Sequence, residues 1–121
     1  KVVIPRHGFF RQDGQSVQKF AIKTMTQMIR DLQQEYRDPK RPWGFVGHQA
    51  NLRMLERVCD ACEIAPEHHF HNLVDFGNTA AAGSPSVLSQ RWDSWGASND
   101  VAVAGVGAGL TWSSYLLRFR S

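Results

Sequence analysis

The chain has 121 residues, of which 42% are hydrophobic and 21% charged, so its composition is that of an ordinary globular domain. Fourteen Lys and Arg against eleven Asp and Glu give a formal net charge of +3, which falls short of the basic stripe of a nucleic-acid binder. With two cysteines, no signal-like leader and no apolar run near the ~20 residues of a membrane span, we expect a cytoplasmic protein that does not enter a membrane.

A long amphipathic helix is predicted over residues 15–36, after a short start at residues 1–12. Apolar side chains from Val17 to Tyr36 recur at three- and four-residue spacings, which place them on one helical face. Residues 38–42 carry two prolines, which end the helix. We interpret the basic residues around these prolines as a solvated turn rather than a binding patch.

The rest of the chain alternates between short strands and helices. The predicted elements are, in order, a strand over residues 43–46, a helix over 52–62, a strand over 70–76, a helix over 80–95, a strand over 100–105 and a strand over 110–119. No linker divides the chain, so we predict one α/β layer structure.

Three of the predicted strands end in a polar or glycine-rich turn, and these turns contain His48, Asn78 and residues 105–109. If the strands are neighbours with their ends on one side, the turns meet where ligands bind in α/β sheets. A His beside an Asn amide supplies two neutral donors for a thioester enolate or an oxyanion, and glycines let backbone N–H groups approach closely. From these residues alone, a purely structural His48 and an Asn78 that only caps a helix stay open as alternatives.

Three segments resemble, in order and spacing, signature segments of the ketosynthase III (3-oxoacyl-[acyl-carrier-protein] synthase III) family. They are His48-Gln49-Ala50-Asn51-Leu52-Arg53, Phe76-Gly77-Asn78-Thr79-Ala80-Ala81-Ala82 and Gly107-Ala108-Gly109-Leu110-Thr111-Trp112. The resemblance runs from about Gly14 to the C-terminus, and the 30-residue interval from His48 to Asn78 fits the catalytic His and Asn of that family. It implies the C-terminal half of a thiolase-like α/β fold, in which a mixed sheet covered by helices pairs with a similar N-terminal half.

The resemblance implies a decarboxylative Claisen condensation in fatty-acid or polyketide-type biosynthesis. In the family, a Cys takes the acyl group from an acyl-CoA, and the His and Asn assist malonyl decarboxylation by hydrogen bonding to the thioester carbonyl. By resemblance, His48 and Asn78 take those roles, and Gly107, Ala108 and Gly109 form the oxyanion loop. No cofactor is implied, since CoA and carrier-protein phosphopantetheine thioesters are substrates.

The same resemblance implies further site residues and partners. Gly14 and Asn51 match positions that line the CoA and pantetheine tunnel. Lys19 and Arg53 match basic positions that dock the acidic acyl carrier protein, with a solvated helix face as the alternative interpretation. Acyl-CoA and acyl carrier protein are therefore the expected partners, and the parent enzyme is expected to be a homodimer.

The nucleophilic Cys of the family lies in an N-terminal half that this sequence does not contain. We therefore expect residues 1–121 to be the C-terminal portion of such an enzyme and to be inactive in condensation alone. Cys59 and Cys62 follow His48 on the next predicted helix, and we interpret them as small buried side chains. A zinc or redox site is not expected, because only one Cys pair exists and the nearby histidines fall in or beside the next predicted strand, at His68, His69 and His71.

Other departures from the family pattern concern specificity. Gln18 stands where the family often has an aromatic residue, Ala80 and Gly83 replace serines, and Ala108 replaces a glycine of the oxyanion loop. These changes indicate a specialised member, such as one of secondary metabolism. Two alternatives stay open: a non-decarboxylating acyltransferase of the same fold that acylates oxygen or nitrogen, and a noncatalytic partner subunit or fragment that supports an active ketosynthase and binds carrier protein.

Overall fold

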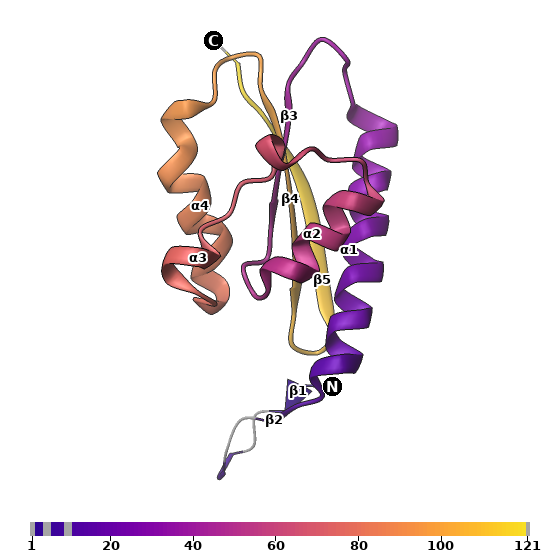
Figure 1. The fold of residues 1–121 in the computed structure, drawn as a ribbon, viewed down its shortest axis with the longest axis vertical. Coiled ribbons are helices and arrows are strands. Elements are labelled where there is room, and N and C mark those ends of the chain that lie inside the picture. The colour runs from indigo at the N-terminus through magenta and orange to yellow at the C-terminus, as the bar shows by residue number, and fades with distance from the viewer. Residues whose placement is uncertain (1, 4–5, 9–10, 121) are drawn as a thin grey trace.

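The computed structural model describes residues 2–3, 6–8 and 11–120, which form a layered α/β arrangement around one mixed sheet (Figure 1). The sheet has the order β3-β4-β5, from β3 (Trp43–Gly47), β4 (Asp100–Gly107) and β5 (Thr111–Arg118). β3 pairs with β4 in parallel, and β4 pairs with β5 antiparallel in a hairpin. The parallel pair leaves the carboxyl ends of β3 and β4 at the same edge of the sheet.

Two helices, α1 (Gly14–Tyr36) and α2 (Leu52–Ala61), cover one face of the sheet. Each begins at a polar residue whose side chain accepts a hydrogen bond from the first turn: Asp13 Oδ1 from Ser16 N at 3.3 Å, and Asn51 Oδ1 from Met54 N at 3.3 Å. The predicted boundaries of both helices are confirmed to within one residue. Neither they nor any other helix of the described part of the chain has the length and apolarity to cross a membrane.

The shorter elements connect these layers. They are β1 (Val2–Val3), β2 (Arg11–Gln12), η1 (Pro66–His68), α3 (Leu73–Phe76), η2 (Ala80–Ala82), α4 (Gly83–Arg91) and η3 (Trp92–Ser94). β1 and β2 pair antiparallel, and α4 packs on the face of the sheet opposite α1 and α2.

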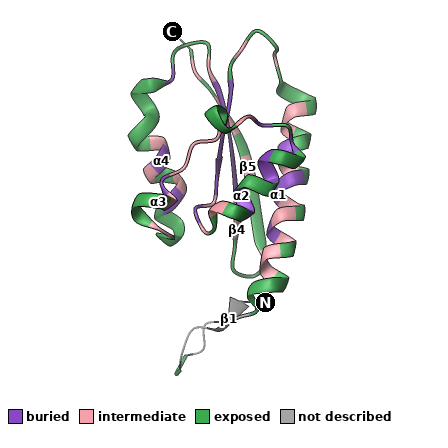
Figure 2. Ribbon diagram, in the orientation of Figure 1, coloured by how far each residue is buried: buried purple, intermediate pink, exposed green. Residues whose placement is uncertain are grey.

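The buried residues, purple in Figure 2, form two clusters, one on each face of the sheet, because side chains alternate along the strands. Phe45 and Ala102 face α1 and α2, whereas Val46 and Val101 face α4. Both faces of β3 and the first five residues of β4 are buried, which explains why these strands are almost uninterrupted runs of small and apolar residues.

A buried carboxylate lies at the end of the sheet opposite the carboxyl ends of β3 and β4. Asp100, 1% exposed, accepts hydrogen bonds from Arg41 Nε at 2.8 Å and from Arg118 Nη2 at 2.9 Å. Arg41 also donates to the backbone carbonyls of Asn99 and Phe119. The basic turn expected at residues 38–42 is therefore tied into the sheet through Arg41.

The predicted strand over residues 70–76 is wrong. The only pairing with β3 lies at the start of this segment: a parallel bridge joins Phe45 to His69, the residue before it, and the N–H of Phe70 donates to the carbonyl of Phe45 at 2.9 Å. Residues 73–76 then form α3. The carbonyl of Asn72 accepts from the amides of Asp75 and Phe76, so the backbone closes on itself instead of pairing with a neighbour. Two of its apolar side chains also point to the surface, with Val74 77% and Phe76 58% exposed. Apolar composition alone misled the strand prediction here.

Two other boundaries differ from the predictions. The helix predicted over residues 80–95 is divided into η2, α4 and η3, and α4 occupies residues 83–91. β4 continues to Gly107, so the turn predicted to begin at Gly105 begins at Ala108. The last strand, β5, is confirmed to within one residue at each end.

Candidate active site

A cleft of about 1170 Å³ opens at the end of the sheet where β3 and β4 finish. Its walls come from the first turns of α1, the turn after β3, the loop after α3 and the β4–β5 hairpin, which lie together at the lower end of the molecule in Figure 1. Six residues predicted from the sequence line it: Gly14, His48, Asn51, Asn78, Gly107 and Ala108. The predicted convergence of three turns is thus confirmed, although only two of the turns follow strands.

His48 is held by backbone bonds directly after β3. Its N–H donates to the carbonyl of Ala104 on β4 at 2.9 Å, and its carbonyl accepts from Ala50 N at 2.8 Å. The preceding Gly47 has no space for a side chain, because an added Cβ would collide with Leu55 Cδ2 and lie 2.9 Å from Phe45 Cζ. Burial lowers the pKa of His48, so its imidazole is neutral at pH 7 and can donate from one ring nitrogen.

Asn78 lies in the loop between α3 and η2, at the mouth of the cleft. Its Oδ1 accepts a hydrogen bond from Ala80 N at 2.9 Å, forming a local turn in which Ala80 has a φ of 54°. Gly77, directly before it, has a φ of 63° and makes the bend that ends α3. With its oxygen engaged, Asn78 has its Nδ2 group available as a donor.

The β4–β5 hairpin forms another wall of the cleft and contacts α1 through the rings of Trp112 and Phe20. Gly107 and Ala108 line the cleft, and Thr111 Oγ1 donates to the carbonyl of Ala108 at 3.1 Å. Gly109 has a φ of 125°, a conformation that favours glycine, but it does not line the cleft. Of the three residues predicted for the oxyanion loop, two therefore border the space in which a substrate would lie.

One helical stripe of α1 forms the floor of the cleft, and the sequence analysis placed only its first residues, Gly14 and Gln18, near the site. Gly14, Gln18, Ala21 and Met25 line the cleft at helical spacing, joined by Met54 of α2. Ala21 and Met25 lie on the apolar face predicted for residues 15–36, and both are buried. The same periodicity serves both purposes, so spacing alone cannot separate cleft from core.

The predicted docking residues lie outside the cleft. Lys19 and Arg53 are exposed near the N-terminal ends of α1 and α2. Both side chains are exposed to solvent, which is compatible with a docking surface and equally with a solvated helix face.

The two cysteines also lie away from the cleft. Cys59 and Cys62 are buried free thiols on and just after α2, in the cluster between the helices and the sheet. Burial raises the pKa of both thiols, that of Cys59 to about 12. They are packing residues in this structure and present no thiolate to the cleft.

Two of the nearby histidines, His69 and His71, contact each other with their rings tilted. The rings of His69 and His71 are 4.9 Å apart, and His69 stacks on Phe45 at 5.5 Å. Within residues 2–3, 6–8 and 11–120, no group of three or more His, Cys, Asp or Glu residues is arranged to hold a metal ion.

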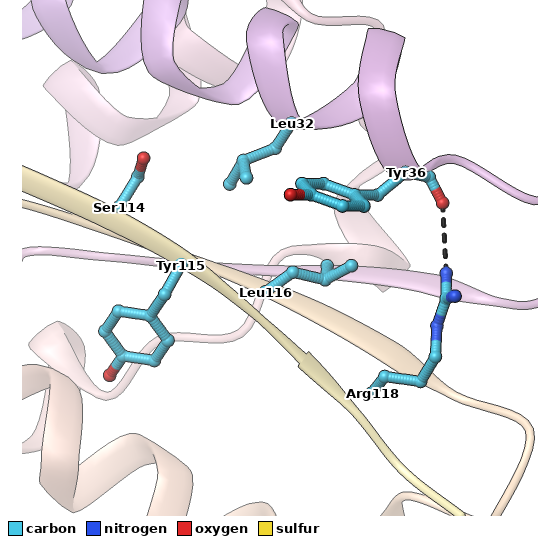
Figure 3. A pocket seen from close by; sticks show the side chains of 6 residues that line it. All are labelled: Leu32, Tyr36, Ser114, Tyr115, Leu116 and Arg118. Carbon is cyan, nitrogen blue, oxygen red and sulfur yellow. Dashed lines mark hydrogen bonds between the residues drawn. The ribbon is translucent and has the colours of Figure 1, made fainter.

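A second, smaller hollow of about 420 Å³ lies between the C-terminal half of α1 and β5 (Figure 3). Leu32 and Tyr36 border it on the helix, and Leu116 lies opposite them on the strand. Arg118, at its rim, donates to the carbonyl of Tyr36 at 3.1 Å and is also paired with Asp100. The guanidinium group of Arg118 is already paired with these two partners, so it is less available to bind a ligand in this hollow than the donors of the cleft are.

The fold that presents this cleft is the C-terminal half of a thiolase fold, with a mixed sheet between helical layers. The crystal structure of 3-oxoacyl-[acyl-carrier-protein] synthase III from Aquifex aeolicus superposes with a TM-score of 0.88 at 27% identity. That match covers 98% of this chain and 39% of the Aquifex chain.

Sequence similarity gives the family. The family model described as 3-Oxoacyl-[acyl-carrier-protein (ACP)] synthase III C terminal matches residues 32–119, and the chain belongs to this family. The β-ketoacyl-[acyl-carrier-protein] synthase III of Gloeobacter violaceus is 35% identical over 118 residues, covering 94% of this chain and 36% of the relative. The synthase of the same name from Streptococcus thermophilus strain LMD-9 is 30% identical over 114 residues, covering 91% and 35%. The chain thus spans about a third of the length of these relatives.

Proposed function

We propose that the protein catalyses decarboxylative condensation of an acyl group with a malonyl thioester, yielding a 3-oxoacyl thioester and carbon dioxide. The observation that carries this proposal is the shared cleft, into which His48 and Asn78 come from two different elements beside a glycine-rich hairpin. Family membership supports the same reaction class, because the matched relatives are named as synthases of this type.

The proposed chemistry begins with loss of carbon dioxide from the malonyl group. The electron pair of the breaking carbon–carbon bond forms an enolate, whose negative charge concentrates on the thioester oxygen. A ring N–H of His48 and the Nδ2 group of Asn78 donate to that oxygen, and each such donor contributes about 3 kcal/mol of transition-state stabilisation. Both donors are neutral, so they act most strongly when the charge develops and bind the uncharged carbonyl only weakly.

Bond formation follows at the enolate carbon. It attacks the carbonyl carbon of the acyl thioester, a new carbon–carbon bond forms, and the sulfur leaves as a thiolate when the tetrahedral intermediate collapses. The oxyanion of that intermediate needs donors of its own. Backbone N–H groups at Gly107 and Ala108, which border the cleft, are our proposed source for them.

The acyl-accepting thiolate must come from outside the two cysteines of this chain. Cys59 and Cys62 are buried, have raised pKa values and do not line the cleft. The proposed function therefore requires a nucleophilic cysteine from another part of the protein or from a partner, and residues 1–121 are expected to make no condensation product by themselves.

Thioester substrates are proposed to enter along the floor of the cleft. Gly14 leaves open space at the start of α1, since an added Cβ would meet no atom within 4 Å. The apolar side chains of Met25 and Met54 suit a pantetheine arm or an acyl chain. Asn51 uses its oxygen to cap α2, which leaves its Nδ2 group to donate to the pantetheine amides.

Acyl carrier protein is the proposed macromolecular partner. Lys19 and Arg53 are exposed on neighbouring helices that also border the cleft, where they would meet an acidic surface. Because the contact would be electrostatic, the proposal predicts weaker binding at higher salt.

Malonyl-thioester decarboxylation by the native protein tests this proposal. Wild-type protein should release carbon dioxide from malonyl thioester, and His48→Ala should lower that rate by about 100-fold, the effect of removing one oxyanion donor. The Lys23→Ala variant, altered at an exposed position of α1 outside the cleft, is the control and should retain the wild-type rate. A His48→Ala protein that decarboxylates at the control rate would refute the assigned role.

A further inference from the structure

His48 and Asn78 must be held at a fixed distance from each other, although Asn78 does not follow a strand. His48 belongs to the turn of residues 47–51, called here the His48 turn, which is anchored to β4 through Ala104. Asn78 belongs to residues 73–82, called here the Asn78 segment, which contains α3 and η2 and lies outside the sheet. Something other than the strand ladder must therefore set the distance between the two donors.

A fully buried glutamine joins the start of the Asn78 segment to the His48 turn. Gln49 is 0% exposed and does not line the cleft. Its Oε1 accepts from the backbone N–H of Asn72 at 3.1 Å, and its Nε2 donates to the carbonyl of Gly47 at 2.7 Å. One amide thus spans from the residue before His48 to the residue before the Asn78 segment.

Asn72, which is bonded to Gln49, is also hydrogen-bonded to α3 and α4. Its carbonyl accepts from the amides of Asp75 and Phe76 and so begins α3. Its buried side chain donates from Nδ2 to Ser86 Oγ at 2.8 Å and to Gln90 Oε1 at 3.2 Å on α4. The position of Asn72 therefore determines where the short helix leading to Asn78 starts.

The end of the Asn78 segment is anchored to the same backbone carbonyl. Ser84 Oγ, in the first turn of α4, donates to the carbonyl of Gly47 at 2.9 Å. Gly83 packs so closely that an added Cβ would lie 2.7 Å from Gln49 Cβ. Both ends of the segment thus meet at Gly47, directly before His48.

We propose that Gln49 and Ser84 are positioning residues that hold the Asn78 segment against the His48 turn and so set the geometry of the two donors. This inference rests on the proposed function, in which both donors act on one oxygen. A displacement of about 1 Å in such an arrangement can lower a rate by about 100-fold. Gln49 acts from behind the cleft, without touching substrate.

The decisive variant is Gln49→Met in the native protein, because Met is similar in length but makes neither hydrogen bond. Gln33→Met is the matched control: Gln33 Nε2 donates to the carbonyl of Cys62 at 3.0 Å and also joins two helical elements, but away from the cleft. For Gln49→Met we expect the kcat of malonyl decarboxylation to fall at least tenfold with KM within about twofold. Gln33→Met should keep kcat within about twofold, even where both variants lose similar thermal stability.

Amide hydrogen exchange provides a readout that does not depend on activity. Gln49→Met should accelerate exchange in residues 73–82 and leave β4 unchanged, whereas Gln33→Met should leave both unchanged. Unaltered exchange in residues 73–82 of folded Gln49→Met would overturn the inference. Faster exchange with a wild-type kcat would overturn it too, provided that His48→Ala has lost activity.

Failure of the proposed function gives a different result. In that case His48→Ala decarboxylates at the wild-type rate, while the exchange experiment still decides whether Gln49 anchors the segment. Should Gln49→Met not fold, Ser84→Ala removes only a hydroxyl and tests the other anchor, with an expected three- to tenfold loss of kcat and faster exchange in residues 79–82. A wild-type kcat and exchange pattern in Ser84→Ala would then overturn the proposal.

Discussion

Asn78 Oδ1 accepts a 2.9 Å hydrogen bond from the N–H of Ala80, and this bond orients the amide. The oxygen is engaged locally, so Nδ2 is the group that can serve a substrate. We predict that Asn78→Asp keeps the acceptor for Ala80 but replaces the donor with a negatively charged oxygen. Decarboxylation should then fall by about 100-fold or more, since a donor is lost and an enolate is repelled.

The matched control for this prediction is Asn99→Asp. Asn99 Oδ1 also accepts from a nearby backbone amide, that of Gly96 at 2.7 Å, but Asn99 does not line the cleft. Steady-state decarboxylation and thermal melting of both variants measure the difference. Equal rates for the two variants would show that Asn78 contributes no donor.

Removing the buried carboxylate should strongly destabilise the protein. Asp100→Ala leaves the guanidinium groups of Arg41 and Arg118 without their common partner, and breaking a buried pair typically costs about 3–5 kcal/mol. We expect a loss of about 3 kcal/mol, because both arginines are partly exposed and can recruit water. Urea unfolding should show at most about 0.5 kcal/mol of change for Asp31→Ala, an exposed control, and equal losses in both variants would contradict the prediction.

Stability should decrease as the pH falls from 6.5 toward 4, in part through His69. Burial, with a smaller effect from His71, lowers the pKa of His69 from 6.5 to about 4. Between these values the unfolded chain binds more protons than the folded one, so the stabilisation is complete above pH 6.5 and is lost toward pH 4. Asp100 affects stability only at lower pH. Burial would raise its pKa, but hydrogen bonds from Arg118 and Arg41 hold that pKa below 3.8.

The His69→Phe variant isolates that contribution. Phenylalanine can keep the stack on Phe45 but does not titrate. Urea unfolding between pH 7 and 4 should therefore give a shallower decline of the free energy of unfolding than in the wild type. Some slope should remain, because burial lowers the pKa of His48 in the same direction. Identical slopes in the two proteins would exclude a role for His69.

The thiol of Cys59 should be unreactive in the folded protein. Burial is the main reason that its pKa is about 12, so almost no thiolate exists at pH 8, and the side chain is only 5% exposed. Iodoacetamide followed by peptide mass spectrometry should label Cys59 only after denaturation. Rapid labelling of the native protein, compared with a guanidinium-treated sample, would contradict this burial.

The secondary structure that periodicity predicted correctly is the part that packs against the sheet. α1 and α2 place apolar side chains on one face, and β3 and β4 are apolar on both, so their patterns follow from burial. Residues 70–76 failed this reasoning because two of their apolar side chains, Val74 and Phe76, are exposed, and a local backbone turn at Asn72 decides their conformation.

The candidate site was predictable to a similar extent. His48 follows a real strand, so its place at the sheet edge could be inferred from sequence. Asn78 was also expected beside His48, and it does line the same cleft, but the strand on which that expectation depended is the helix α3. The roles of Gln49 and Ser84 depend on contacts between residues far apart in the chain, which no local pattern encodes.

The two-ended attachment of the Asn78 segment has a consequence for heat resistance. Residues 78–82 are exposed, whereas Val101 to Ala104 of β4 are buried, so the loop can detach at a temperature that leaves the sheet intact. If Asn78 is needed for turnover, heating should abolish activity several degrees before the circular dichroism signal changes. Cooling from that interval should restore activity at once, because the core has not unfolded and only the hydrogen bonds to Gly47 and Gln49 must re-form.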